Sequence, residues 1–406
     1  MSFDKLTYQK GDALSLPKGW EIKKLGDVCT IKGRIGYRGY TKQDLVEKGY
    51  GAISLSPSNI QNNKFNSNEC TYISWFKYEE SPEIMVFNGD ILFVKTGSTF
   101  GKVALVEDLP ARATINPQFV VLKELKCSNR FLYYALTTNS FKKQVDGIIG
   151  GAATPTLSQT NLAELEVPIP PLPEQHSIIF ILDEAFAAIA KAKANAEQNL
   201  KNAKELFESY LQGVFEKGDW ETKTLNQISE NLDSKRVPIT KNIRKSGDIP
   251  YYGASGIVDH VEDYLFDEDL LCISEDGANL LARTYPIAFS ISGKAWVNNH
   301  AHVLKFPNLT TQKFVETYIN SIKIDDFVSG MAQPKLNQAM LNRIPIPFPP
   351  IAEQQTIVRR LDALRSETQK LEVLYQKKLD DLEELKKSIL QKAFAGELKT
   401  EKEVVV

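Results

Sequence analysis

The chain reads P-T-L-S-Q at 155–159, P-I-P-P-L-P-E-Q at 168–175 and S-Y-L-Q-G-V-F at 209–215. The same pattern returns 179 residues later as P-K-L-N-Q, P-F-P-P-I-A-E-Q and S-I-L-Q-K-A-F. No insertion or deletion separates residues 151–215 from their copy at 330–394. Because each inserted residue would lengthen an α-helix by about 1.5 Å, the two equal copies predict two helices that span one fixed distance.

The repeat extends outward into two heads. W-E-I-K-K-L at 20–25 matches W-E-T-K-T-L at 220–225, and D-I-L-F-V at 90–94 aligns with D-L-L-C-I at 269–273. Short β-rich runs separated by Gly, Asn and Pro indicate strands in both heads. Each head ends in a proline-rich strap, which favours stiff, extended backbone and leads into a long helix.

These features predict an α+β fold class. We expect two mixed α/β heads joined by two long helices in an antiparallel coiled coil, with an internal pseudo-two-fold repeat. The predicted boundaries place an N-terminal tail at 1–16, the first head at 17–172, the first helix at 173–216, the second head at 217–349, and the second helix with a C-terminal tail at 350–406.

The helices carry a heptad seam, since apolar residues recur in alternating steps of four and three. The predicted seam residues are Ile178, Leu182, Ala192, Ala196, Leu206 and Tyr210 in the first helix, and Ile357, Leu361, Leu371, Tyr375, Leu385 and Ile389 in the second. In an antiparallel pair, small Ala192 and Ala196 would face large Tyr375 and Leu371. A helical hairpin that only holds a core together is the open alternative to a spacer.

Length and composition bound the class of protein. With 406 residues, 42% of them hydrophobic, the chain can bury ordinary cores in about two to four domains. Its four cysteines show no C-x-x-C spacing, the N-terminus has no signal-peptide core, and no apolar run reaches the roughly 18 residues of a membrane span. We therefore expect a reduced, cytoplasmic setting. The net charge of −2 means that any DNA-binding charge must be local.

The chain resembles the specificity subunits of type I restriction–modification systems. The resemblance rests on the order and duplication of P-K-G-W-E-I-K-K-L-G-D-V at 17–28, D-W-E-T-K-T-L at 219–225, G-R-I-G-Y-R-G-Y-T at 33–41, N-G-D-I-L-F-V-K-T-G at 88–97, I-P-Y-Y-G-A-S-G-I at 249–257, N-N-H-A-H-V-L at 298–304, P-P-L-P-E-Q at 170–175 and P-P-I-A-E-Q at 349–354.

The resemblance implies a role for each part of the chain. Each head would be a target-recognition domain that reads one half of a split, asymmetric sequence in double-stranded DNA. The helices would set the gap and dock DNA methyltransferase (modification) subunits and restriction/translocase subunits. Those partners would carry the S-adenosylmethionine and ATP/Mg sites, and this chain would hold no cofactor.

Loops of both heads offer the side chains that DNA recognition needs. Lys and Arg neutralise phosphates, whereas amides, guanidinium groups and hydroxyls read base edges. In the first head we predict contacts from Lys32, Arg34, Tyr37, Arg38, Tyr40, Lys42, Lys95, Ser98, Lys102, Asn116 and Gln118. In the second head we predict contacts from Lys235, Arg236, Lys241, Arg244, Lys245, Tyr251, Tyr252, Asn279, Arg283, Lys294, Asn298 and His300. The alternatives are solvated basic turns and amides that satisfy local backbone.

Two stretches of the sequence partly match the motifs of a nucleotide site and a metal site, but neither has the complete residue pattern that such a site requires. G-S-T-F-G-K at 97–102 has too few residues between its glycines for a P-loop, and Val103 stands where Ser or Thr is required. His300 and His302 would share one strand face, but no further Cys or His completes a metal set. We therefore expect no catalytic residue and no metal site, and a non-catalytic DNA-recognition subunit.

Two other functions stay open. The chain is also compatible with the recognition subunit of a type II enzyme that cuts on both sides of a split site. The near-neutral pI of 6.2 mildly favours a coiled-coil scaffold whose heads bind proteins instead of DNA. Salt-sensitive binding to duplex DNA would exclude the scaffold.

Overall fold

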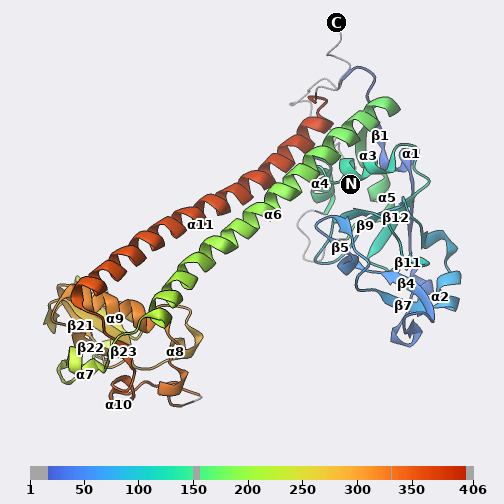
Figure 1. Cartoon of the computed structure of the whole chain (residues 1–406). Coiled ribbons are helices and arrows are strands. Elements are labelled where there is room, and N and C mark those ends of the chain that lie inside the picture. The colour runs from blue at the N-terminus through green and yellow to red at the C-terminus, as the bar shows by residue number, and fades with distance from the viewer. Residues whose placement is uncertain (1–16, 150–155, 331, 399–406) are drawn as a thin grey trace, which may run out of the picture. The chain divides into compact units, whose positions relative to one another are not determined.

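Figure 1 shows the computed structural model of the chain, which describes residues 17–149, 156–330 and 332–398. Its two long helices are α6 (Leu172–Lys217) and α11 (Ile351–Phe394). The chain divides into a first compact unit, which ends at Ala194 and is completed by the residues from Leu379 onward, and a second unit from Asn195 to Lys378. Each unit therefore contains one head and a part of both helices.

The first head contains two main sheets, with strand orders β10-β9-β12-β2 and β3-β7-β4-β11-β8, and a small β5-β6 hairpin. The strands are β2 (Thr30–Gly33), β3 (Leu45–Val46), β4 (Gly51–Leu55), β5 (Ile60–Gln61), β6 (Lys64–Phe65), β7 (Thr71–Ser74), β8 (Met85–Val86), β9 (Ile91–Val94), β10 (Val103–Leu105), β11 (Ala113–Ile115) and β12 (Phe119–Lys123). The helices are α1 (Leu25–Val28), α2 (Trp75–Glu79), α3 (Asn129–Leu136), α4 (Asn139–Ile149) and α5 (Gln159–Ala163), with short 3-10 turns η1 (Gly36–Arg38), η2 (Lys42–Asp44), η3 (Pro57–Asn59) and η4 (Pro82–Ile84).

Strand β9 is buried on both faces, which explains its unbroken apolar sequence. On one face Phe93 packs edge-on against Phe141 of α4, with ring centroids 6.5 Å apart. On the other face Leu92 lies in the core shared with Ile53 of β4. The four-stranded sheet is therefore the middle layer, with helices on one side and the five-stranded sheet on the other.

The second head repeats this layering with strand orders β15-β22-β19-β20 and β17-β16-β21-β18. Its strands are β15 (Glu230–Asn231), β16 (Ile249–Gly253), β17 (Gly256–Val261), β18 (Phe266–Asp267), β19 (Leu270–Ser274), β20 (Ala288–Ile291), β21 (Lys294–Val297) and β22 (Ala301–Lys305). Its helices are α7 (Leu225–Ile228), α8 (Asn279–Ala282), α9 (Leu309–Ser321) and α10 (Gln338–Leu341), with 3-10 turns η5 (Asp233–Lys235), η6 (Lys241–Ile243) and η7 (Asp325–Phe327).

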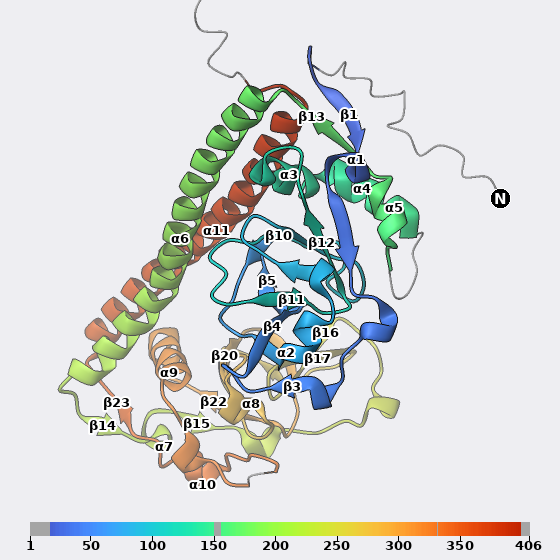
Figure 2. The same cartoon turned by 90° about the vertical axis from the view of Figure 1, so that its right-hand side faces the viewer.

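The proline-rich straps form short two-stranded ribbons at the base of each head. In the first, β1 (Glu21–Lys24) pairs antiparallel with β13 (Glu166–Ile169), next to the start of α6 (Figure 2). In the second, β14 (Thr222–Lys223) pairs with β23 (Ile346–Pro347). The repeated E-Q dipeptide fixes the turn into each helix, since Gln175 Nε2 donates to Pro170 O (2.9 Å) and Gln354 Nε2 donates to Pro349 O (2.8 Å).

The two long helices pack antiparallel within each unit. In the first unit, Ile178 and Leu182 near the start of α6 share a core with Ala393 near the end of α11, and Lys193 Nζ lies 2.5 Å from Glu383 Oε1. In the second unit, the Arg365 guanidinium lies over the Phe207 ring at 4.9 Å. The predicted fold class, an α+β chain with two sheet-containing heads and two packed helices, is confirmed.

The seam differs from the predicted heptad at three positions. Ile178, Leu182, Ala196 and Leu361 are buried and Ala192, Ile357, Leu371, Tyr375 and Ile389 are partly buried, but Leu206, Tyr210 and Leu385 are exposed by 49%, 38% and 48%. In α6, Phe207 and Leu211 are partly buried, whereas Leu206 and Tyr210 are exposed. A straight α-helix drifts by about 20° per heptad, which displaces the covered stripe by one residue over this length.

Among the residues that the structure describes, no helix combines the length and the apolar character needed to cross a membrane.

Candidate functional site

In the first head, four loop segments meet where β9 ends and β12 begins. Lys95 N–H donates to Gln118 O (2.8 Å), and Leu157 N–H donates to Lys95 O (2.9 Å). Asn116 N–H donates to Leu55 O at 2.9 Å, which ties the end of β4 to the same place. We call residues 33–42, 95–102, 116–118 and 156–159 the first edge.

A local turn fixes the two amides of the first edge. Asn116 Oδ1 accepts from the backbone N–H of Gln118 at 3.0 Å, and Asn116 Nδ2 donates to Gln118 Oε1 at 3.1 Å. A Cβ at position 97 would lie 3.0 Å from Gln118 Nε2, and Gly97 has φ +100°. Only glycine therefore lets the backbone pass this close to the amide.

Three of the predicted first-head residues make internal contacts. Arg34 is 5% exposed, and its guanidinium donates to Ile115 O (3.1 Å) and Arg38 O (3.2 Å). Burial lowers the pKa of Arg34, although Tyr40 acts in the opposite direction. The Tyr40 hydroxyl accepts from Ser54 Oγ at 2.8 Å, and Arg38 pairs with Glu83 at 3.4 Å. These contacts give all three residues a part in shaping the loop, and their predicted DNA contacts stay predictions.

Of the remaining predicted residues of the first head, six lie at or near the surface, whereas Asn116 is buried. Lys32, Lys42 and Ser98 are exposed, and Lys95, Lys102 and Gln118 are partly buried. Asn116 is 8% exposed. Tyr37 belongs to η1, but its side chain lies outside the described part of the chain. The first edge therefore collects cations and amides from segments that are far apart in the sequence.

The second head contains an equivalent edge where β19 ends and β22 begins. Glu275 N–H donates to His300 O (2.9 Å), and Leu336 N–H donates to Glu275 O (2.8 Å). Asn298 N–H donates to Tyr252 O at 3.0 Å, and Asn298 Oδ1 accepts from His300 N–H at 2.8 Å. We call residues 253–256, 275–277, 298–300 and 334–336 the second edge.

Strand pairing corrects the alignment of the two heads by one residue. Val94 pairs with Phe119 in the first head, and Ser274 pairs with Ala301 in the second. Val94 therefore corresponds to Ser274, an offset one residue longer than the 179 expected from D-I-L-F-V and D-L-L-C-I. Unbroken apolar strands lack the alternation that would fix their register from sequence. In the corrected alignment, Thr96 corresponds to Asp276, and Gln118 corresponds to His300.

Several predicted second-head residues also bond internally. Arg244 pairs with Asp259 (2.9 Å) and lies over the ring of buried Tyr251 at 4.2 Å. Arg283 has φ +52° and donates to the carbonyls of Ile319 and Ile322. The others are placed as follows: Lys235 and Lys241 are exposed, Lys245 lies 3.6 Å from Glu262, Lys294 lies over Tyr264, Tyr252 stacks on Phe289, Asn298 is buried, and Asn279 bonds the backbone of Tyr285.

A partly buried charged cluster supports the second edge, and sequence reasoning missed it. Asp233, Glu275 and His302 place one ligand-type atom each within 4.8 Å of one another. Arg236 donates to Glu275 Oε2 at 2.7 Å, and Lys335 lies 3.2 Å from the other Glu275 oxygen. Because these cations balance the carboxylates, the cluster is complete as an ion-pair network.

The electrostatics of the cluster follow from these contacts. Burial would raise the pKa of Asp233, but the hydrogen bond and proximity of His302, the Val303 N–H and the Arg236 charge together outweigh it, and the pKa is lowered. Burial likewise opposes the ionised form of Glu275, whose pKa is lowered by the Arg236 hydrogen bond and by nearby His302. His302 Nδ1 lies 2.6 Å from Asp233, and its Nε2 lies 2.7 Å from Leu336 O. The imidazole thus connects the core of the head to the loop that carries Lys335.

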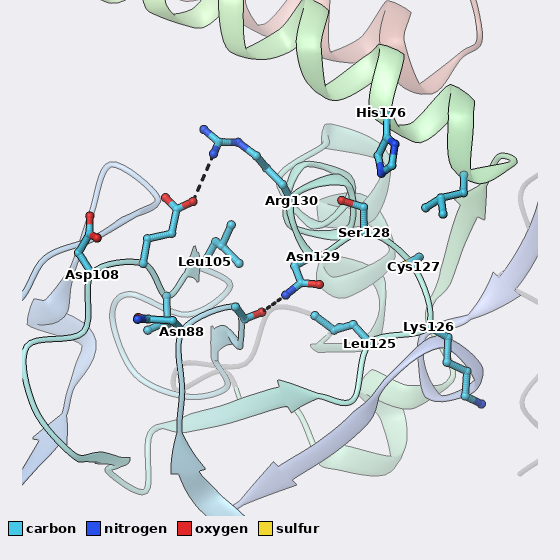
Figure 3. Close-up of a pocket in the computed structure, with 14 residues that line it drawn as sticks. Asn88, Leu105, Asp108, Leu125, Lys126, Cys127, Ser128, Asn129, Arg130 and His176 are labelled. Carbon is cyan, nitrogen blue, oxygen red and sulfur yellow. Dashed lines mark hydrogen bonds and ion pairs between the residues drawn. The ribbon is translucent and has the colours of Figure 1, made fainter.

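An open hollow of about 960 Å³ lies beside α3 in the first unit (Figure 3). Arg130 pairs with Glu107 across it (3.2 Å), and Asn129 Nδ2 donates to Gly89 O (2.7 Å). Burial raises the pKa of Cys127 to about 11, so its thiol stays protonated near neutral pH and is a poor nucleophile. Arg130 and Asn129 are thus bonded to other residues that line the hollow.

Comparison with known proteins gives a consistent result. The sequence matches the type I restriction modification DNA specificity domain at residues 17–201 and again at 217–386. A putative type I restriction enzyme specificity subunit of Haemophilus influenzae is 36% identical over 39% of this chain and 41% of its own length. The EcoKI specificity subunit of Escherichia coli is 23% identical over 94% of this chain and 90% of its own length.

Two solved structures share the fold. The HsdS subunit from Thermoanaerobacter tengcongensis superimposes with a TM-score of 0.63 at 19% identity, covering 94% of this chain and 98% of that one. A chain from a structure of a type I R-M system, described in terms of complex assembly and conformational transition, gives a TM-score of 0.71 at 17% identity over 94% and 99% of the two chains.

Proposed function

Because this chain belongs to the type I restriction–modification DNA specificity family, we propose that its two heads read the two halves of one bipartite, asymmetric DNA sequence. The observation that carries the proposal is the pair of equivalent edges. Both have the same backbone hydrogen bonds, but Gln118 and Thr96 in the first are replaced by His300 and Asp276 in the second. One frame with different polar groups suits two different half-sites.

In this proposal, phosphate and base contacts come from different groups of residues. Exposed Lys32, Lys42, Lys235 and Lys241 would neutralise phosphates, and the polar segments at 116–118 and 298–300 would form the part of each edge that faces the bases. Arg34, Arg236, Arg244 and Arg283 would hold the loops in shape. The target-recognition domains would occupy the boundaries predicted from the sequence, 17–172 and 217–349.

The paired helices would act as the ruler between the half-sites. Half-site centres about 10 bp apart would keep both heads on one face of the duplex. The same helices would dock methyltransferase and restriction/translocase subunits, whose S-adenosylmethionine and ATP/Mg sites would perform the chemistry. The complex would work in the cytoplasm, which suits the four free thiols of this chain.

Salt dependence of DNA binding tests this proposal. The complex would be purified from its host through this chain, and its affinity for duplex DNA measured across a range of salt concentrations. If Lys32 and Lys42 each contact a phosphate, replacing both with alanine should reduce the slope of log affinity against log salt by about 1.8. Lys24→Ala is the matched control, since Lys24 pairs with Glu164 at 2.6 Å in the strap region.

Three outcomes distinguish the candidate functions. If the slope of log affinity against log salt is unchanged in the double variant, Lys32 and Lys42 do not contact phosphates. Binding that does not depend on salt, or no DNA binding at all, would favour the protein-binding scaffold. A partner that fuses nuclease and methyltransferase would favour the type II enzyme.

A further inference from the structure

The second edge carries a carboxylate paired with an imidazole, where the first edge carries hydroxyl and amide side chains. His300 Nδ1 lies 2.9 and 2.8 Å from the two carboxylate oxygens of Asp276. An ionised carboxylate can only accept hydrogen bonds, so Nδ1 carries the proton. At the equivalent positions of the first edge, Thr96 Oγ1 meets Thr156 Oγ1 at 2.8 Å, and Gln118 bonds Asn116. The two edges therefore present different chemistry on one frame.

The Asp276 carboxylate has His300 as its partner, and the Lys and Arg of the neighbouring charged cluster bind other carboxylates. Lys335, which forms a β-bridge with Asp276, directs its ammonium to Glu275 at 3.2 Å. Arg236 bonds Glu275 and Asp233. Within the described ranges, no Lys or Arg forms an ion pair with Asp276. Its side chain is 26% exposed, and that of His300 is 51% exposed.

A carboxylate in this position suits a base edge better than a phosphate. The DNA backbone is anionic and would repel it. In the major groove the only donors are the N4 amine of cytosine and the N6 amine of adenine, and adenine presents its N7 acceptor beside that amine. An amide satisfies adenine's donor and acceptor together, whereas a carboxylate leaves N7 without a donor. Cytosine is the better match.

We propose that Asp276 accepts a hydrogen bond from cytosine N4, so that the half-site read by the second head requires a cytosine. His300 acts as a positioning residue, since its Nδ1–H holds the carboxylate in place. The partly buried network of Asp233, Arg236, Glu275 and His302 holds the backbone next to the pair. This inference rests on the proposed function, and it assigns base chemistry to one named side chain.

The test is a base-preference measurement on the assembled complex. The complex purified through this chain would select from duplex DNA in which each position of the bipartite sequence is randomised in turn. The native protein should require cytosine at one position of one half-site. Asp276→Asn should lose that preference by about tenfold to hundredfold, with every preference in the other half-site unchanged.

Further variants distinguish a loss of base recognition by Asp276 from a general disturbance of the second head. Asp276→Thr places the side chain of the first edge at the same position of the frame, and it should lose the same preference. His300→Ala should weaken it at that position alone. Glu268→Gln is the control, because Glu268 lies beyond the opposite end of β19, where it pairs with Lys305, and it should change no preference.

The outcomes distinguish this inference from the proposed function. If the native complex selects a bipartite sequence but Asp276→Asn and Asp276→Thr keep every base preference, the inference is overturned. A lost preference for a base other than cytosine, or a uniform loss of affinity, overturns it as well. If the native complex selects no bipartite sequence, the proposed function fails and the inference fails with it.

Discussion

At the residue scale, basic side chains on loops serve two different purposes in this protein. Arg236 and Arg244 bond carboxylates 39 and 15 residues away, whereas Lys235 and Lys241 are exposed. All four look alike in sequence, since each stands on a polar loop. The sequence predicted where charge gathers, but which charges are free depends on partners that only the fold brings close.

Arg236 allows a direct test of the charged network around Glu275. Arg236→Ala would leave partly buried Asp233 and Glu275 without this partner, and should lower the free energy of unfolding of the second unit by about 1–3 kcal/mol. Lys305→Ala removes a more exposed pair with Glu268 and should cost about 0–1 kcal/mol. Urea denaturation of the purified chain measures both. Equal losses in the two variants would show that the network is not a stabilising element.

The same network predicts a dependence of stability on acid. The pKa values of Asp233 and Glu275 are lowered in the folded chain, so the folded state binds fewer protons than the unfolded state. Their stabilisation is therefore complete above their ordinary values of 3.8 and 4.5, and is lost as pH falls through the lowered values. Unfolding free energies measured from pH 6 downward should show a smaller acid loss in a chain with Asp233→Asn and Glu275→Gln. An identical acid loss would contradict this account.

At the scale of elements, the two long helices were predictable because their repeat has no insertions and their apolar residues keep a helical period. The register within the seam was less predictable. A heptad assumes 3.5 residues per turn, whereas an unsupercoiled helix has 3.6. Because this difference accumulates along α6, the residue that faces α11 changes from the predicted Leu206 to Phe207. The predicted alignment of β9 with β19 was wrong by one residue. Both strands are apolar at nearly every position, so they lack the alternation that would fix their register.

Alanine substitutions at two adjacent positions of α6 distinguish the two registers. Phe207 lies under Arg365 at 4.9 Å, and Leu206 is 49% exposed. Phe207→Ala should therefore destabilise the helix pair by about 1–3 kcal/mol, and Leu206→Ala by less than about 1 kcal/mol. Thermal unfolding of the two variants provides the comparison. A larger loss at Leu206 would restore the predicted heptad.

The length of α6 gives a test of the ruler. Four residues inserted after Ala194 would lengthen the helix by about 6 Å, close to two base pairs at about 3.4 Å each. The gap in the recognised sequence should widen by one or two base pairs, with both half-sites unchanged. Four residues inserted in the turn of the β5-β6 hairpin, at Asn62 and Asn63, serve as the control. A gap that stays constant when α6 is lengthened would reject the spacer role.

At the scale of the whole molecule, the duplication in sequence and the duplication in structure agree. The strap, the layered sheets and the turn at 116–118 or 298–300 occur once in each head. The duplicated turn could be predicted from the sequence, because N-P-Q at 116–118 and N-N-H at 298–300 stand at matching places before the two V-L-K strands. The charged cluster of the second head was not, since its members come from four separate segments and the first head has no counterpart in sequence.

The central claim is that two unlike heads read two half-sites of one DNA sequence. Its most direct test is a map of methylated bases in the host genome, made with and without the gene for this chain. We predict that deletion removes methylation from a single bipartite, asymmetric motif and that restoring the gene returns it. A methylation map that does not change on deletion would contradict the claim.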